Sequence, residues 1–287
     1  MSRAEIVSAP VSAHGEGPIW DSFHRRLFWV DMMGRQLHAL DPASGAVESK
    51  SFPDLVCAIA PTGSARLQVA FAKELAWVDW PSGAVTPIVA VEPDQPGNRC
   101  NDGKRDPAGR FWIGTMSRSG EVVGAGALYR LEIDGTLTRV LSGLTIANGL
   151  GWSPDQRTMY FIDSPTREVW AFDFDPADSS ISNRRTAIRV PESLGWPDGM
   201  TIDAEGNLWV AHWGAGCVAR WEARSGRLLE TIATDCPNTS SCSFGGDDGR
   251  TLFITTSQLG LSATEVARTP LSGCLLKATV PVPSTLK

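Results

Sequence analysis

An internal repeat constrains the fold of this chain more than any other feature. The segment DAEGNLWVA, at 203–211, reads as a tight turn followed by an aromatic strand. Variants recur as DSFHRRLFWVD (21–31), TGSARLQVAF (62–71), DPAGRFWIGT (106–115), SPDQRTMYFID (153–163) and GDDGRTLFITT (246–255). Each copy is followed by a second alternating strand, which in most copies runs into an Asp, Pro, Ser or Gly turn typical of a hairpin. The chain is therefore built from six similar β units.

The spacing of the units predicts a β-propeller. Equivalent positions fall near 16, 57, 101, 148, 198 and 242. Units of four strands that repeat every ~40–50 residues are typical of propeller blades. We predict an all-β, six-bladed β-propeller of four-stranded antiparallel blades, with residues 1–287 as one domain. A loose array of β-sandwiches is the alternative, but it explains six in-phase copies less well.

The two ends of the chain are expected to close the ring. The last unit has no clear fourth strand, whereas the N-terminal segment RAEIVSA (3–9) alternates without a partner of its own. We predict that this segment supplies the outer strand of the sixth blade. A closed ring leaves few exposed edges, so we expect a monomer.

Composition narrows the class of partners. The formal net charge is -6 and no cluster of Lys and Arg stands out, so nucleic acid and anionic membrane are poor partners. The segment MSRAEIVSAPVSAHGEGP at 1–18 has no apolar stretch, so we expect no secretory signal, and because the sequence has no run of about 18 apolar residues we expect no membrane span. None of its six cysteines forms a C-x-x-C pair, which favours buried free thiols and a cytoplasmic location.

One phase of the repeat predicts a metal site. The residues in this phase lie at or just before the innermost strand of each blade, which faces the central channel; they are Glu16, Cys57, Asn101, Asn148, Asp198 and Cys242. Glu16, Asn148 and Asp198 would bring two carboxylates and one amide oxygen to one point. Such an oxygen set suits a hard divalent cation. Three protein ligands would leave positions open for water and substrate.

A simpler reading of the same residues is that they form turns. Glu, Asn and Asp before Gly are common where a chain enters a strand. The sequence also lacks the G-x-S-x-G, H-E-x-x-H and G-x-x-x-x-G-K motifs of other enzyme classes. His14 and His212 lie close to the ligand-bearing segments, and Trp20, Trp196 and Trp213 lie near channel-facing loops. Any of these rings could line the pocket or fill the core.

Long motifs in the right order identify a family. The segments HGEGPIW, NRCNDGKRDPAGRFWIGTM, IANGLGWSPD, PDGMTIDAEGNLWVAHWG and FGGDDGRTLFITT resemble the SMP-30/gluconolactonase/luciferin-regenerating-enzyme family. The resemblance spans nearly the whole chain. It implies a six-bladed propeller with one divalent metal in the channel, and hydrolysis of aldonolactones to aldonic acids. The HWGAG segment around Trp213 looks closer to the bacterial sugar lactonases of the family than to its animal members.

The resemblance also implies roles for single residues. The metal ligands of the family fall on Glu16, Asn148 and Asp198, and its substrate-contacting arginine and asparagine fall on Arg99 and Asn101. Animal members carry a sugar-contacting acid three positions after the methionine of GTM, where this chain has Ser119. The nearest acid is Glu121, so we expect Glu121 to contact substrate, and substrate preference to differ here.

These residues suggest a mechanism. A cation at the site would polarise the lactone carbonyl, with Asp198 as general base for the attacking water and Glu16 as second choice. Arg99 and Asn101 would donate hydrogen bonds to the substrate, and His14 and Trp213 would line the pocket. Oxygen ligands do not fix the metal, so Ca²⁺, Zn²⁺, Mg²⁺, Mn²⁺ and Fe²⁺ all remain candidates.

Three functions fit the sequence. The first is a metal-dependent sugar lactonase acting on glucono-, xylono- or arabinono-type lactones. The second is a metal-dependent hydrolase of other esters or organophosphates. The third is a non-catalytic calcium-binding regulatory propeller. Arg99 and Asn101 favour a small polar substrate and hence an enzyme, because the fold alone hosts many functions.

Overall fold

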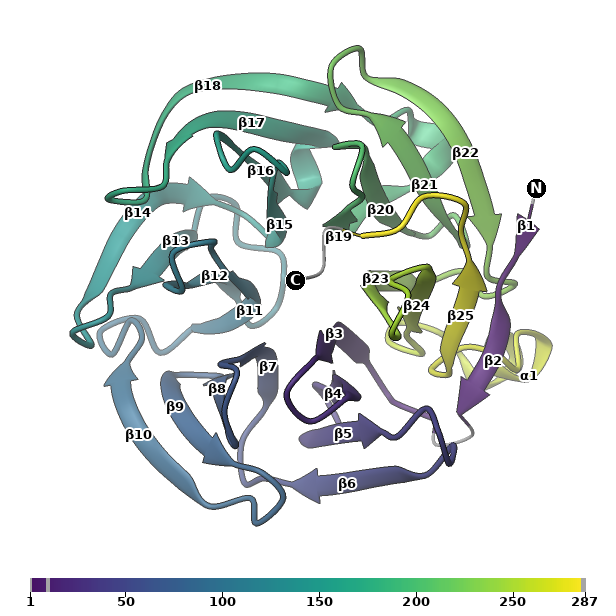
Figure 1. Ribbon diagram of the computed structural model, residues 1–287, viewed down its shortest axis with the longest axis horizontal. Coiled ribbons are helices and arrows are strands. Elements are labelled where there is room, and N and C mark those ends of the chain that lie inside the picture. The colour runs from purple at the N-terminus through teal and green to yellow at the C-terminus, as the bar shows by residue number, and fades with distance from the viewer. Residues whose placement is uncertain (1, 9–10, 285–287) are drawn as a thin grey trace.

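Six β-sheets are arranged radially around a central axis (Figure 1). The structure is a computed structural model that describes residues 2–8 and 11–284. In each blade the consecutive strands pair antiparallel in chain order from the innermost strand toward the rim, and the N-terminal segment adds strands at the outer edges of the last two blades. The predicted all-β, six-bladed propeller of four-stranded blades is confirmed.

The strand bounds follow the repeat. Blades one and two are β3 (Gly15–Asp21), β4 (Arg26–Asp31), β5 (Gln36–Leu40), β6 (Val47–Ser51), β7 (Val56–Pro61), β8 (Arg66–Phe71), β9 (Glu74–Asp79) and β10 (Val85–Ala90). Blades three and four are β11 (Asn98–Arg105), β12 (Phe111–Ser117), β13 (Gly126–Leu131), β14 (Leu137–Leu144), β15 (Ala147–Trp152), β16 (Thr158–Asp163), β17 (Glu168–Asp175) and β18 (Ser180–Arg189). Blades five and six contain β19 (Trp196–Ile202), β20 (Leu208–Trp213), β21 (Cys217–Glu222), β22 (Arg227–Ala233), β23 (Thr239–Gly245), β24 (Thr251–Thr256) and β25 (Leu275–Thr279).

The N-terminal segment closes the ring, as the sequence predicts. Strand β2 (Glu5–Ser8) pairs antiparallel with β25 and is the outer strand of blade six. The structure adds a contact that we did not predict: β1 (Ser2–Arg3) pairs parallel with β22, as a fifth strand on blade five. The first residues of the chain therefore bridge the two last blades. The end of the predicted segment, Ala9, lies outside the described residues.

The repeated turn is held by one recurring hydrogen bond. In blade three, Trp112 Nε1 donates to Asp106 Oδ2 over 3.0 Å, and in blade five Trp209 Nε1 donates to Asp203 Oδ2 over 3.1 Å. Both tryptophans are fully buried. The aspartate that opens the turn thus also satisfies the indole N–H of the strand that follows, which a buried tryptophan requires.

The core is divided among the gaps between blades. Each of the six hydrophobic clusters joins two neighbouring blades, for example Phe28 with Val69 and Phe161 with Trp112. No blade can bury its two faces alone, so the blades stabilise one another around the ring.

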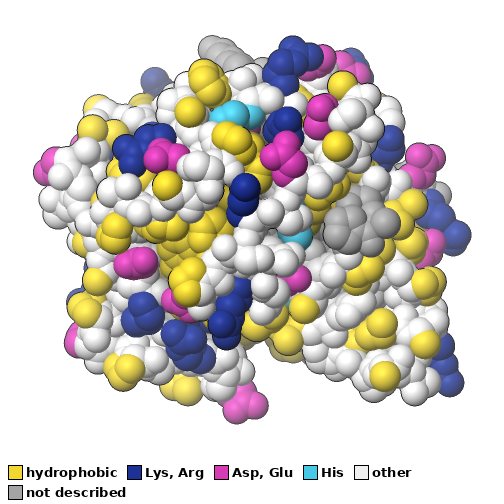
Figure 2. Space-filling model, turned by 90° about the horizontal axis from the view of Figure 1, so that it is seen from below, with side chains coloured by type: hydrophobic (Ala, Val, Ile, Leu, Met, Phe, Trp, Pro, Cys, Tyr) yellow, Lys and Arg dark blue, Asp and Glu magenta, His cyan; other side chains and the backbone are white. Residues whose placement is uncertain are grey.

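Little besides strands is present. The described chain has one short α-helix, α1 (Ala263–Arg268), and two 3₁₀ turns, η1 (Ser164–Thr166) and η2 (Glu192–Leu194). No helix in residues 2–8 and 11–284 is long and apolar enough to cross a membrane. On the side that Figure 2 shows, basic, acidic and apolar side chains are interspersed.

Candidate functional site

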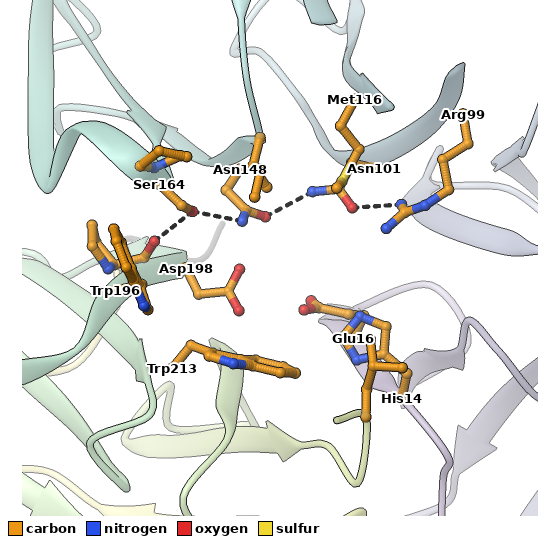
Figure 3. Close-up of a pocket in the computed structure, with 14 residues that line it drawn as sticks. His14, Glu16, Arg99, Asn101, Met116, Asn148, Ser164, Trp196, Asp198 and Trp213 are labelled. Atoms are coloured by element: carbon orange, nitrogen blue, oxygen red, sulfur yellow. Dashed lines mark hydrogen bonds between the residues drawn. The ribbon is translucent and has the colours of Figure 1, made fainter. Parts of the chain in front are cut away.

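A β-bulge in each innermost strand positions the candidate ligands. The pairing of every innermost strand with its neighbour slips by one residue near the strand's start. In β15 the slip lies between Ala147 and Leu150 and contains Asn148; in β19 it lies between Pro197 and Met200 and contains Asp198. A bulge leaves residues out of the ladder and re-aims their side chains, often at functional sites. Here it turns them toward the axis (Figure 3).

The glycines beside the ligands let the innermost strands approach closely. A Cβ on Gly199, next to Asp198, would lie 2.1 Å from Ser241 Oγ on blade six. A Cβ on Gly149, next to Asn148, would lie 2.5 Å from the carbonyl oxygen of Asp198 on blade five. The Asn-Gly and Asp-Gly pairs are therefore more than turn formers. They bring the backbones of neighbouring blades together around the channel.

The side chains converge on a cavity of about 320 Å³ at one mouth of the channel. It is lined by His14, Glu16, Arg99, Asn101, Met116, Ile146, Asn148, Ser164, Pro165, Trp196, Pro197, Asp198, Trp213 and Leu259. All but one of the residues to which the sequence analysis assigned a catalytic, metal-binding or substrate-binding role are among them. Glu121 is the exception: it is exposed and lies outside the cavity lining.

A chain of hydrogen bonds fixes the amides on one wall (Figure 3). Arg99 donates from Nη1 to Asn101 Oδ1 over 2.7 Å, and Asn101 Nδ2 donates to Asn148 Oδ1 over 3.0 Å. Asn148 Nδ2 in turn donates to Ser164 Oγ over 2.8 Å, and the Ser164 hydroxyl donates to the Pro197 carbonyl over 2.6 Å. The chain crosses blades three, four and five. These hydrogen bonds fix the orientation of the Asn148 amide: its nitrogen faces Ser164 and its oxygen faces Asn101.

Two buried carboxylates face each other across the cavity. Glu16 and Asp198 are each 6% exposed, and Figure 3 shows both carboxylates pointing toward the centre. Burial and the neighbouring Asp102 raise the pKa of Glu16 to about 8. Burial, Glu16 and Asp102 raise the pKa of Asp198 well above its ordinary value, and Arg99 offsets these effects only in part. Each carboxylate is thus poorly compensated by the residues around it.

This donor set fits a divalent cation. Within residues 2–8 and 11–284, the Asp198 carboxylate accepts no hydrogen bond, and Glu16 accepts one, from Gly17 N over 3.1 Å. Two carboxylates and the oriented oxygen of Asn148 are hard oxygen ligands. No group of three or more His, Cys, Asp or Glu side chains in the described chain could hold a metal. The Glu16, Asn148 and Asp198 set is not such a group, because its third ligand would be the amide oxygen of Asn148.

His14 and Trp213 form another side of the cavity. Their rings meet edge to face, with centroids 5.7 Å apart and planes at 87°. His14 Nδ1 lies 2.9 Å from Ser257 Oγ. Burial and Arg99 lower the pKa of His14 to about 4, so the imidazole is neutral at neutral pH. It can offer one hydrogen bond or accept one, without adding charge.

Arg99 is the cation of the site and has unused donor capacity. Its side chain is 6% exposed, and Nη1 also donates to the Cys100 carbonyl over 2.9 Å. Buried Nε has no hydrogen-bond partner among the described residues. The other terminal nitrogen, Nη2, makes no hydrogen bond among the described residues and lies on the cavity side in Figure 3, so a bound acceptor could pair with it.

Some expected residues lie elsewhere, and some lining residues were missed. His212 is fully buried and accepts a hydrogen bond from Trp221 Nε1 over 3.3 Å, so it belongs to the blade core. Trp20 lines other cavities. Ser164 and Leu259 were not foreseen. Both follow the second strand of their blade, as the HWGAG loop does, and that shared position was the available signal.

Comparisons with known proteins identify the family of the chain. Residues 14–258 match the family model described as SMP-30/Gluconolactonase/LRE-like region. The chain is 37% identical to regucalcin from Danio rerio, over 96% of this chain and 94% of the relative. It is 35% identical to the putative sugar lactone lactonase YvrE from Bacillus subtilis (strain 168), over 92% of this chain and 90% of the relative.

A solved structure shows the same architecture. The calcium-binding protein regucalcin from Agrobacterium tumefaciens strain C58 superposes with a TM-score of 0.95 at 28% identity, covering 100% of this chain and 96% of that one. The family description and the lactonase relative support a lactonase-type function within the family. The blades, the convergent site and these matches show that this chain belongs to the SMP-30/gluconolactonase/LRE-like family.

Proposed function

We propose that this protein is a metal-dependent lactonase that opens aldonolactones to aldonic acids in the Glu16–Asn148–Asp198 cavity. One observation carries the proposal: two buried carboxylates and an oriented amide oxygen face one point, beside the Arg99 guanidinium, whose Nη2 makes no hydrogen bond among the described residues. Such a cavity suits a small, polar, neutral substrate that carries an ester group. The Agrobacterium relative is named as calcium-binding, which makes Ca²⁺ the first metal to test.

The chain's own residues have distinct parts in this chemistry. A divalent cation held by Glu16, Asn148 and Asp198 supplies Lewis acidity toward the lactone carbonyl. Asp198 accepts the proton of the attacking water and returns it to the ring oxygen as the acyl–oxygen bond breaks, so the ring oxygen becomes a hydroxyl and the new carboxylic acid ionises to release the proton that is measured. Arg99 donates from its free N–H groups to the ester oxygens.

Asn101 acts mainly on its neighbours. Both hydrogens of its Nδ2 are used, by the Ala147 carbonyl over 2.9 Å and by Asn148 Oδ1 over 3.0 Å. Only its oxygen has spare capacity for a substrate hydroxyl. We therefore assign Asn101 to orienting Asn148 and Arg99, in place of the substrate donation suggested by the sequence.

The test uses chelator-treated protein and a panel of pentono- and hexonolactones. Ca²⁺, Mg²⁺, Mn²⁺, Zn²⁺ and Fe²⁺ are added back singly, and proton release is followed against the spontaneous rate. We expect turnover that needs one of these cations and falls by about 100-fold or more in Asp198→Asn, which keeps the shape but not the base. A folded, metal-loaded Asp198→Asn protein with full activity would refute the role of Asp198.

A non-catalytic calcium-binding propeller is the second candidate, favoured by the name of the Agrobacterium relative. Cation binding measured calorimetrically, with no turnover on any lactone, aryl ester or organophosphate, would select it. Turnover on esters or organophosphates alone would select the broader hydrolase. We further propose a cytoplasmic monomer whose partner is the small substrate, with no role for nucleic acid or membrane; size-exclusion chromatography with light scattering tests the monomer.

A further inference from the structure

The cavity is polar at its floor and apolar at its mouth. The apolar lining residues are Met116, Ile146, Pro165, Trp196, Pro197, Trp213 and Leu259. Trp196 and Leu259 are 41% and 40% exposed, which is unusual for large apolar side chains beside a charged site. Exposed apolar groups that rim a cavity mark a surface kept for a ligand.

Trp196 and Trp213 lie on neighbouring strands and both line the cavity, and we call these two residues the platform. Trp196 and Trp213 are directly opposed partners on β19 and β20. The Arg167 guanidinium lies 3.8 Å from the centroid of the Trp196 ring and donates from Nη1 to the Gly195 carbonyl over 2.5 Å. Arg167 therefore covers one part of Trp196 and holds the ring in place. A side chain that is 41% exposed yet held in this way is preorganised for contact.

Most side-chain hydrogens of the amides and the hydroxyl that line the cavity already donate hydrogen bonds within the protein. Both hydrogens of Asn101 Nδ2, one of Asn148 Nδ2 and the hydroxyl hydrogen of Ser164 are used within the protein. Spare hydrogen-bonding capacity remains on buried groups at the floor, namely Arg99, the Glu16 and Asp198 carboxylates, His14 Nε2, one hydrogen of Asn148 Nδ2 and the oxygen of Asn101, whereas Trp196 and Leu259 are exposed. A substrate hydroxyl placed at the mouth would contact Trp196, Trp213 and Leu259. It would lose its hydrogen bonds to water without gaining one from these side chains, which is unfavourable.

We propose that the preferred lactone carries an apolar exocyclic arm, methyl or larger, that lies on Trp196, Trp213 and Leu259 while the ester group sits at the floor. This inference rests on the proposed lactonase function and narrows its substrate class to terminally deoxygenated or alkyl-substituted lactones. It makes the three rim residues specificity determinants, and Arg167 a positioning residue for Trp196.

The comparison that tests this uses lactones differing only in the arm. L-rhamnonolactone and L-mannonolactone differ by CH₃ against CH₂OH, and L-fuconolactone and L-galactonolactone form a second such pair. A hydrophobic pocket discriminates by up to roughly 100-fold against an added hydroxyl, and an open rim by less. We expect kcat/KM to favour the deoxy member by about tenfold in at least one pair.

Variants assign the preference to the rim. In Trp196→Ala and Leu259→Asn the ratio of the two kcat/KM values falls to about one, while Arg167→Ala lowers it partway through KM, with kcat little changed. Ile133→Ala is the matched control, because Ile133 is 74% exposed and does not line this cavity. The targeted side chains are exposed or half-exposed, so the variants keep the fold, which circular dichroism confirms.

The possible outcomes distinguish a failure of the apolar-arm inference from a failure of the proposed lactonase function. Equal rates within each pair, or a preference for the hydroxymethyl member, overturn the apolar arm while leaving the lactonase intact. A deoxy preference that survives both rim variants overturns the assignment to Trp196 and Leu259. No turnover on any lactone with any of the five cations refutes the lactonase itself, and this inference with it.

Discussion

The side-chain amide of Asn101 on blade three donates to Asn148 on blade four over 3.0 Å, so one candidate ligand is oriented by a residue of the neighbouring blade. Residues that orient a metal ligand typically contribute 10–100-fold to metal affinity. We predict that Asn101→Ala weakens cation binding by about tenfold, measured by calorimetry, without unfolding the protein. Gln95→Ala, an exposed amide on the loop before β11, is the control and should bind normally.

Cation binding should be coupled to protons. The pKa values of Glu16 and Asp198 are raised in the metal-free site, so a cation must displace protons that these groups hold. We predict that affinity rises with pH by up to one log unit per pH unit for each proton released, and levels off above about pH 8. Calorimetry in buffers of different ionisation enthalpy counts the protons. Affinity that does not change between pH 5 and 8 would contradict this, and Glu16→Gln should flatten the dependence.

Stability of the metal-free protein should fall as pH rises. A carboxyl group whose pKa is raised on folding stabilises the folded state below its unfolded pKa and loses that contribution as pH passes its folded pKa. For Glu16 the window runs from the ordinary value of 4.5 to about 8. We predict a decreasing Tm across this range in chelator, and recovery on adding the cation. Asp198→Asn removes one buried charge and should raise the metal-free Tm at pH 8 by ~2–4 °C per kcal/mol of repulsion relieved.

The glycine beside Asp198 should be intolerant of any side chain. In Gly199→Ala the new Cβ would meet Ser241 Oγ at 2.1 Å and Ser241 Cα at 2.8 Å, which forces β19 and β23 apart. Overpacking of this kind costs about 1–3 kcal/mol, and cation affinity should fall with it. Gly97→Ala, where nothing lies within 4 Å of the new Cβ, is the control. Urea unfolding measures both; equal midpoints would show that the strands can shift without cost.

Much of the fold could be predicted from the repeat, because a polar turn before an apolar strand recurs in every unit, and in most units the turn contains Asp. The closing role of β2 could be predicted from the missing fourth strand of blade six. The pairing of β1 with β22 could not, since two residues paired in parallel leave no pattern in the sequence.

The phase of the repeat located most of the site, but phase and bulge together did not suffice, because Cys57 lies inside the bulge of β7 and still packs in the core. Asn101, Asn148 and Asp198 lie inside their bulges and line the cavity. Cys242 was assigned to the same phase, but in β23 the pairing slips between Thr239 and Ser241, and Cys242 packs in the core between blades five and six. Counting from an aromatic residue cannot locate a bulge to within one or two residues. The hydrogen bonds that Asn101 donates could not be predicted from the sequence either, because their acceptors lie on the neighbouring blade.

The pairing of β2 with β25 has a consequence for how the protein folds during its synthesis. Strand β2 is synthesised well before its partner β25, because five blades lie between them along the chain. Contacts so distant in sequence form slowly, because the loop that they close is long. A nascent chain therefore holds Glu16 and Asp198 on blades that are not yet joined in a ring, and the cavity that they line is complete only after synthesis has passed β25.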